Sequence, residues 1–321
     1  MLKNTGRHLA GALLACVAMF SAAAQAACPA SPEPIQFTPE QARAALLLAH
    51  DHGFLWRIQK DGRSSYLYGT IHVAKKDWMF PGPVLIRSFQ ASDMVALELD
   101  MLDPEIQRRL VEGLASVHGA TLPEPLVKRM RAQAAALCLP YEALAKLIPE
   151  LQIATLTLLA GRQDGLEPGY AIDILLAGMG HGAKKAVVSL ETPELQLQTL
   201  QMTDAQETIA YVQESLDELQ SDRARLFLNR LTQVWSSGDY DQLSHFFDWC
   251  DCMKTPVEQD LMKRLVDDRN PALARQVDTL HHSGKRVFAA VGSLHMVGPK
   301  GLPALMEALG YQVERIDFQS P

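Results

Sequence analysis

The spacing of apolar positions predicts strands near the start of the chain. Two short runs rich in aromatic and aliphatic residues, 54–58 and 65–68, flank the pair Asp61-Gly62. An Asp-Gly pair between two such runs is a typical sequence of a β-hairpin. A segment with a helical pattern comes next, and the apolar run 94–99 after it predicts a third strand that is largely buried.

The middle of the chain has the spacing of helices. From residue 104 to residue 162, apolar residues recur every three or four positions, which predicts amphipathic helices. Three prolines divide this stretch into four short helices: Pro123, Pro140 and Pro149. A longer helix is predicted to begin with the cap Thr203-Asp204 and to reach about Trp235. Within this middle part, the run 186–190 has the composition of a strand.

The two ends of the chain match each other. The last segments predict a strand, a helix and a strand, at 286–291, 302–309 and 312–318. The same order occurs near the start, and in both places the first strand leads into a Gly-x-x-His turn, Gly69–His72 and Gly292–His295. Two such units can pair in one sheet, with helices around it.

We therefore predict an α/β (α+β) fold. Its central sheet would come from the two strand–Gly-x-x-His–helix–strand units, and a large helical insertion would span about 104–285. We predict a single domain over 27–321, because the matching units at its two ends need each other to form the sheet.

The first 26 residues have the features of a secretory signal peptide. Lys3 and Arg7 precede an apolar run of about a dozen residues, and an Ala-x-Ala site ends at Ala26. The alternative is an uncleaved membrane anchor, for which the run is short, since a bilayer span needs about 20 residues. We predict a mature chain that begins at Ala27, lacks a transmembrane helix and is periplasmic or secreted.

Composition and charge narrow the class of protein. Hydrophobic residues make up 48% of the chain and charged residues 21%, which is typical of a folded globular protein. The net charge of −7 argues against a nucleic-acid partner. Four cysteines follow the signal peptide: Cys28, Cys138, Cys250 and Cys252. In an oxidising compartment this even number predicts at least one disulfide, and free buried thiols are the alternative.

The two Gly-x-x-His turns suggest a metal site. A histidine at the end of a strand lies on a loop that the strand holds in place, and two equivalent turns would bring His72 and His295 together. Paired imidazoles bind first-row divalent metals, especially beside a carboxylate, which Glu98 supplies. A lone loop histidine is usually structural, and we interpret the remaining histidines as surface residues: His50, His52, His118, His181, His245, His281 and His282.

Several segments together resemble the TraB/GumN family, which is related to the TIKI metalloproteases. The matching segments are Tyr66–Val73, Leu97–Asp100, Gly169–Asp173, Ser189–Gln196, Arg269-Asn270 and Val291–Gly298. The resemblance runs from about Phe54 to Phe318, and its specificity lies in the order and spacing of the motifs. One departure is Pro271, where the family usually has a basic residue.

The resemblance implies a metal-dependent, peptidase-like hydrolase. His72, His295 and Glu98 would hold a divalent ion, with Mn, Co and Zn as candidates. Glu98 or Glu191 would act as general base, and Arg269 would stabilise an oxyanion or a substrate carboxylate. Three structural alternatives remain open: an ion pair of Arg269 with Asp267 or Asp268, a helix cap at Asp173, and a purely structural Glu191.

Two other functions fit the same scaffold. One is a non-catalytic, envelope-associated binding protein, and the other is a metal-free, esterase-like hydrolase. The sequence lacks the Gly-x-Ser-x-Gly, Gly-x-Gly-x-x-Gly, Walker and His-Glu-x-x-His motifs, which argues against a serine nucleophile, a nucleotide and an ordinary zincin. The expected substrate is a peptide or an envelope component of unknown identity.

Overall fold

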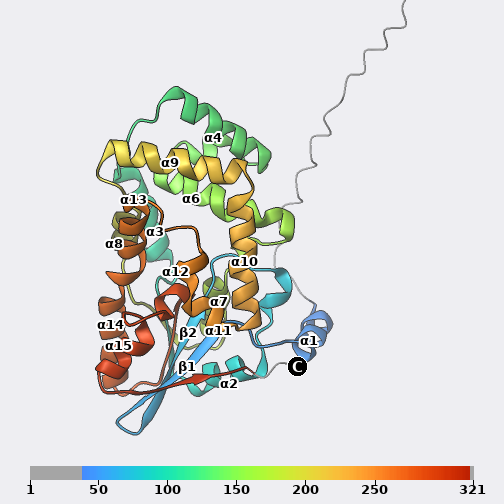
Figure 1. Cartoon of the computed structure of the whole chain (residues 1–321). Helices are drawn as coiled ribbons and strands as arrows, with labels where there is room; N and C mark the ends of the chain where they lie inside the picture. The colour runs from blue at the N-terminus through green and yellow to red at the C-terminus, as the bar shows by residue number, and fades with distance from the viewer. Residues whose placement is uncertain (1–37, 319–321) are drawn as a thin grey trace, which may run out of the picture.

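A computed structural model describes residues 38–318, and within this range six strands form one sheet (Figure 1). The strands are β1 (Phe54–Lys60), β2 (Arg63–Thr70), β3 (Met94–Leu97), β4 (Ala186–Ser189), β5 (Val287–Gly292) and β6 (Gln312–Ile316). Their order across the sheet is β4-β3-β5-β2-β1-β6. The first four in this order are parallel neighbours, whereas β1 is antiparallel to β2 and to β6.

Helices make up most of the chain between β3 and β5 (Figure 1). The α-helices are α1 (Pro39–Leu47), α2 (Pro83–Ala91), α3 (Pro104–Ser116), α4 (Glu124–Ala136), α5 (Tyr141–Leu144), α6 (Pro149–Leu159), α7 (Ile172–Gly182), α8 (Pro193–Leu200), α9 (Ala205–Gln220), α10 (Arg223–Ser237), α11 (Tyr240–Ser244), α12 (Phe246–Trp249), α13 (Pro256–Met262), α14 (Asn270–His282) and α15 (Leu302–Ala308). The other helical segments are η1 (Lys76–Met79), η2 (Ala160–Asp164), η3 (Pro168–Tyr170), η4 (Lys263–Asp267) and η5 (Ser293–Met296).

The predicted α/β fold is confirmed. One unit is β2, the first Gly-x-x-His turn, α2 and β3, and the other is β5, the second turn, α15 and β6. The hairpin between β1 and β2 forms at Asp61 and Gly62, whose φ angles of 52° and 71° are those of a tight hairpin turn. The central strands β3 and β5 are continuous apolar runs, as expected for parallel strands that are covered on both faces.

Three details differ from the sequence predictions. Strand β3 ends at Leu97, so Glu98 is the first residue beyond the strand and not a residue within it. The long helix predicted up to Trp235 is divided into α9 and α10, because Asp222 adopts a left-handed φ of 62°. His281, which was expected at the surface, is fully buried.

The helical part of the chain has a small core of its own. The main core surrounds the sheet, and a second cluster of buried apolar residues joins α4, α5, α6 and α9. Figure 1 shows α4, α6 and α9 of this group stacked beyond one end of the strands. The second cluster explains how a long helical insertion keeps a fixed shape without lying on the sheet.

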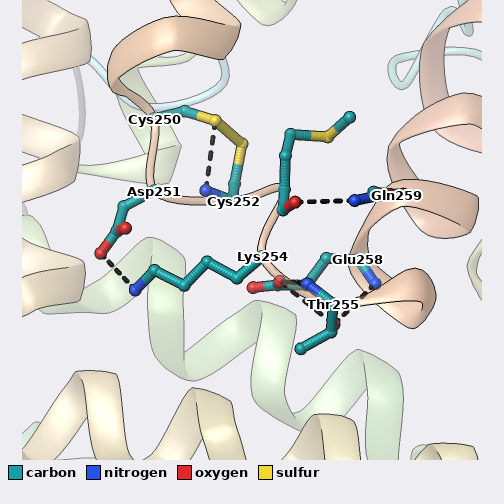
Figure 2. The surroundings of a disulfide bond; sticks show 8 residues. Cys250, Asp251, Cys252, Lys254, Thr255, Glu258 and Gln259 are labelled. Atoms are coloured by element: carbon teal, nitrogen blue, oxygen red, sulfur yellow. Dashed lines mark hydrogen bonds and ion pairs between the residues drawn. A yellow bond between two sulfur atoms is a disulfide. The ribbon is translucent and has the colours of Figure 1, made fainter.

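Some predictions concern residues that the structure does not describe. The signal peptide at 1–26 and Cys28 lie outside residues 38–318, so the division into a leader and one domain stays a prediction. Within 38–318, no helix is long and apolar enough to cross a membrane. Cys250 and Cys252 form a disulfide (Figure 2), which confirms that at least one pair of the four cysteines is joined.

Candidate active site

The four parallel strands each end beside a predicted site residue. His72 follows β2, Glu98 follows β3, Glu191 follows β4 and His295 follows β5. These strands are neighbours in the order β4-β3-β5-β2, so their carboxyl ends lie at one edge of the sheet. In open α/β sheets this edge is where ligands bind.

The strand register aligns these ends. Thr70 at the end of β2 pairs with Gly292 at the end of β5, and Leu97 at the end of β3 pairs with Ser189 at the end of β4. The pairing continues past the strands, because the Glu191 N–H donates to the Glu98 carbonyl at 3.1 Å. The two glutamates are therefore fixed to each other by backbone.

The two Gly-x-x-His turns are locked together. The Ser293 hydroxyl of the second turn donates to the Thr70 carbonyl of the first at 2.8 Å. The Trp235 indole N–H donates to the Gly69 carbonyl at 2.9 Å. A Cβ on Gly69 would lie 2.9 Å from the Ser293 Oγ and 3.2 Å from the Ser293 Cα, so a larger residue here would push against the second turn. The first glycine therefore allows the two turns to pack closely.

The second glycine leaves the space on which the site residues converge. A Cβ on Gly292 would lie 3.3 Å from Glu98 Oε1, 3.6 Å from His295 Cδ2 and 3.7 Å from His72 Nε2. The two histidines and the glutamate thus surround one point at the end of β5. The structure brings these three predicted site residues together.

His72 is oriented by Asp173 of α7. The His72 Nδ1 and the Asp173 Oδ2 are 2.7 Å apart, and the His72 side chain is 56% exposed. The charge of Asp173 raises the pKa of His72 to about 9. Asp173 makes no capping bond at the start of α7, so the structure does not support its interpretation as a helix cap.

His295 is oriented by Asn270, the first residue of α14. The His295 Nδ1 and the Asn270 Oδ1 are 2.5 Å apart, and both residues are buried. The His295 Nε2 lies 3.9 Å from Glu98 Oε1. Burial lowers the pKa of His295 to about 4, despite the opposing effect of Glu98. The second imidazole is therefore neutral near pH 7.

Arg269 joins the two glutamates. Its Nη2 donates to Glu98 Oε2 at 2.5 Å and its Nε donates to Glu191 Oε1 at 2.9 Å. Burial by itself would raise the pKa of Glu98, but the neighbouring His295, Arg269 and His72 and the Gly292 N–H together lower it to about 2.

The predicted alternative partners of Arg269 are wrong, because Asp268 pairs with Lys263 and Asp267 pairs with Lys300. The two aspartates that directly precede Arg269 in the sequence thus take no part in its ion pairs. Its actual partners come from the ends of β3 and β4, which only the sheet topology brings close.

Two site residues had no role assigned from the sequence. In the sequence Asn270 is only the second residue of the Arg269-Asn270 motif, whereas in the structure it holds His295. Gln196 donates to Glu98 Oε2 at 3.3 Å and to Glu191 Oε2 at 3.2 Å. Their positions in the sequence were the only indication of a role in the site, since Asn270 directly follows Arg269 and Gln196 lies five residues after Glu191.

The chemistry of the donors fits a divalent metal. Each Nδ1 is held by a neighbour, and this is how metal-binding histidines are usually oriented so that Nε2 faces the ion. The side chains of both histidines and Glu98 Oε1 border the same space beside Gly292. Within residues 38–318, however, no three His, Cys, Asp or Glu side chains already have the spacing of a metal site. Binding would require the side chains to close around the ion.

Comparisons with known proteins agree with the motifs. The model of the TraB/PrgY/gumN family matches residues 54–315. The chain is 22% identical to Metalloprotease TIKI2 and 24% identical to Metalloprotease TIKI1, both from Danio rerio, over 84% of its own length. It spans 62% and 64% of the lengths of these two proteins. No solved structure matches the chain significantly.

Proposed function

The chain belongs to the TraB/PrgY/gumN family, and from this membership and the site geometry we propose that it is an exported, metal-dependent hydrolase that cleaves peptide-like bonds. The observation that carries the proposal is the convergence of His72, His295 and Glu98 around Gly292. The similarity to proteins named metalloproteases supports the reaction class.

His72, His295 and Glu98 would hold the ion, with Mn, Co and Zn as candidates. When bound, a divalent ion would supply Lewis-acid activation of the scissile carbonyl and of the attacking water. Asp173 and Asn270 hold the proton of each imidazole on Nδ1, which leaves Nε2 as the donor atom. Because the pKa of His72 is about 9, a proton competes with the ion for its Nε2.

The two glutamates have different roles in this proposal. Glu98 keeps its negative charge at neutral pH and turns Oε1 toward the shared space, which suits a metal ligand and a general base. Both oxygens of Glu191 accept hydrogen bonds from Arg269. Glu191 therefore positions Arg269, and Arg269 stabilises the oxyanion or a substrate carboxylate.

One observation favours a metal-free hydrolase as the second candidate. The imidazole of His72 is exposed, bonded to Asp173 and protonated at neutral pH. A histidine–aspartate pair of this kind can donate a proton to a leaving group without an ion. This reading corresponds to the esterase-like alternative that the sequence left open.

The decisive experiment measures metal content and hydrolysis together on the full-length protein after export. We expect about one divalent ion per chain by elemental analysis, and cleavage of peptides from a mixed library that stops with EDTA and returns with Mn, Co or Zn. His72→Ala and His295→Ala should lose both properties, whereas the exposed control His245→Ala should keep both.

The other functions give different results in the same experiment. Cleavage that survives EDTA and is lost in Asp173→Asn would establish the metal-free hydrolase. A bound ion without cleavage of any peptide, under conditions where both histidine variants lose the ion, would favour the binding protein. Absence of both the ion and cleavage would overturn the proposal.

A further inference from the structure

The disulfide between Cys250 and Cys252 lies outside the site described above. It forms part of the wall of a cleft of about 510 Å³ between α9, α10, α12 and α13. The aromatic side chains of Phe227, Phe246 and Trp249 also line this cleft. Such a surface can take an apolar side chain of a peptide beside the two sulfur atoms.

The bridge holds little of the fold together. It joins residues only two positions apart, so it closes a very small loop, and the stabilisation that a disulfide gives falls as its loop shortens. The following chain is fixed by its own bonds (Figure 2): Asp251 pairs with Lys254, and Thr255 and Glu258 form a reciprocal cap at the start of α13. A purely structural purpose is therefore weakly supported.

The backbone at the bridge is in an unfavourable conformation. Asp251, between the two cysteines, has a φ of 59°, in the left-handed region. This conformation costs free energy for any residue with a Cβ, although less for Asp than for most others. The disulfide spans Asp251, so reduction would allow this residue to leave the left-handed region.

The two sulfur atoms are not equivalent. Both cysteines line the cleft, but the Cys250 residue is 4% exposed whereas the Cys252 residue is half-buried. An incoming thiolate can therefore reach Cys252 Sγ more easily than Cys250 Sγ. The Cys252 N–H donates to Cys250 Sγ at 3.2 Å, and this bond would stabilise the negative charge on Cys250 as it leaves.

From these observations we propose that Cys250 and Cys252 form a redox-active disulfide that exchanges with thiols entering the cleft. A substrate thiolate attacks Cys252 Sγ, the bond between the cysteines breaks and Cys250 leaves as a thiolate. A second substrate thiolate then attacks the substrate sulfur and releases Cys252. The substrate dithiol is oxidised to a disulfide, the protein disulfide is reduced, and the two thiol protons pass to Cys250 and Cys252.

This activity is separate from the proposed hydrolysis and does not depend on it. The sequence of steps needs only the disulfide in the protein and a dithiol in the substrate. Oxidised glutathione, or another disulfide of small thiols, can restore the bridge for a further round.

The test follows one turnover with two probes, a reduced two-cysteine peptide and reduced glutathione. The oxidised full-length protein is mixed with each probe, and the free thiols are then blocked with an alkylating reagent. Mass spectrometry of the fragment that contains Cys250 and Cys252 shows whether these cysteines were reduced. We expect peptide oxidation to be about 10-fold faster than with an equal concentration of oxidised glutathione. Reaction of both probes indicates general exchange, and preference for the peptide indicates that the cleft selects it.

Three variants separate exchange from loss of structure. The serine variants are mixed with the oxidised form of the peptide, so that the remaining thiolate can attack the peptide disulfide and stay joined to one of its sulfur atoms. Cys250→Ser should trap this mixed disulfide on Cys252, whereas Cys252→Ser should trap much less on the buried Cys250. Asp251→Gly keeps both cysteines and removes the penalty on the left-handed backbone, so its disulfide should be about 3-fold harder to reduce. Circular dichroism checks that each variant is folded.

The proposal is overturned if the native protein does not oxidise the two-cysteine peptide faster than an equal concentration of oxidised glutathione does. It is also overturned if the two serine variants trap equal amounts of mixed disulfide, because the direction of attack would then be wrong. Loss of the peptide hydrolysis described above, with thiol exchange unchanged, would concern only the proposed hydrolase.

Discussion

Histidines lie at both ends of strands β2 and β5, and their ring nitrogens are bonded differently at the two ends. At the starts of the strands, His281 has both ring nitrogens bonded, Nδ1 to the Ser65 hydroxyl at 2.9 Å and Nε2 to the Lys60 carbonyl at 3.1 Å. At the opposite ends, His72 and His295 have Nδ1 held by a neighbour while Nε2 turns toward a shared space.

The difference distinguishes a structural histidine from one available for chemistry. The Ser65 hydroxyl that contacts His281 also accepts from the Val287 N–H at 2.9 Å, so this group ties β2 to β5. A carbonyl can only accept, so His281 donates through Nε2 and no lone pair is left for a ligand. His295 is also buried, but its Nε2 lies 3.9 Å from Glu98 Oε1. Burial alone therefore does not identify function.

The largest effect is expected when the two buried histidines, His295 and His281, are each replaced by alanine in a separate variant. His295→Ala should lower hydrolysis by about 10³-fold or more, because it removes a donor from the shared space. His281→Ala should leave the metal affinity and the specific activity of the folded protein unchanged. Peptide hydrolysis and calorimetric titration with Mn, Co and Zn measure both properties.

The same pair should behave differently in unfolding. His281→Ala leaves the Ser65 hydroxyl and the Lys60 carbonyl without their buried partner, which should cost about 1–3 kcal/mol in the free energy of unfolding. Urea titration of the metal-free proteins measures this cost. If His281→Ala lost the metal as completely as His295→Ala, the functional distinction between the two ends would be wrong.

The second prediction tests whether the functional end also stabilises the fold. Arg269 is 10% exposed in its side chain and is the shared partner of Glu98 and Glu191. Arg269→Met should therefore destabilise the protein by about 3–4 kcal/mol, because the buried carboxylate of Glu191 and the largely enclosed carboxylate of Glu98 lose their counter-charge. The double variant Arg269→Met/Glu191→Gln should recover part of this loss in urea unfolding. An unchanged single variant would show that solvent already screens these charges.

The third prediction concerns the residues that hold the histidines. Asn270→Ala and Asp173→Ala should each weaken metal binding by about 10- to 100-fold, since each imidazole loses its orienting partner. Asn270→Ala should also lower stability, because His295 Nδ1 is then buried without its bond, whereas Asp173→Ala affects an exposed ring. Equal stability losses would contradict the difference in burial.

The sequence was sufficient to predict what depends on local patterns and on the repeat. The Asp61-Gly62 hairpin, the four helices between residues 104 and 162, and the approach of His72 to His295 all followed from spacing and symmetry. These features are predictable because turn chemistry and apolar periodicity act over a few residues.

The errors concern contacts between distant segments. His281 appeared to end a surface helix, but the start of β2 covers it, and nothing near it in sequence indicates that contact. The partners of Arg269 lie 78 and 171 positions away in the sequence. The sequence suggested an ion pair with the neighbouring Asp267 or Asp268 instead. The break at Asp222 required a left-handed residue other than glycine, which composition does not reveal.

The smallest expected effect concerns the pH dependence of stability at the structural end. Burial lowers the pKa of His281, the charge of Arg63 adds to this, and the bond to the Lys60 carbonyl opposes it. Because the folded pKa lies below the usual value of 6.5, the unfolded chain binds the proton more readily. The contribution of His281 should be complete above pH 6.5 and should decrease as the pH falls below that value. His281→Gln, which keeps a donor and an acceptor but does not titrate, should lose less stability between pH 8 and pH 5 than the native protein. The exposed neighbour offers a matched control, His282→Gln, measured by the same urea titrations at each pH. If the stability of the native protein falls no more than that of His281→Gln over this range, the buried ring accepts a proton without cost. The two ends of β2 and β5 would then differ in geometry but not in electrostatics.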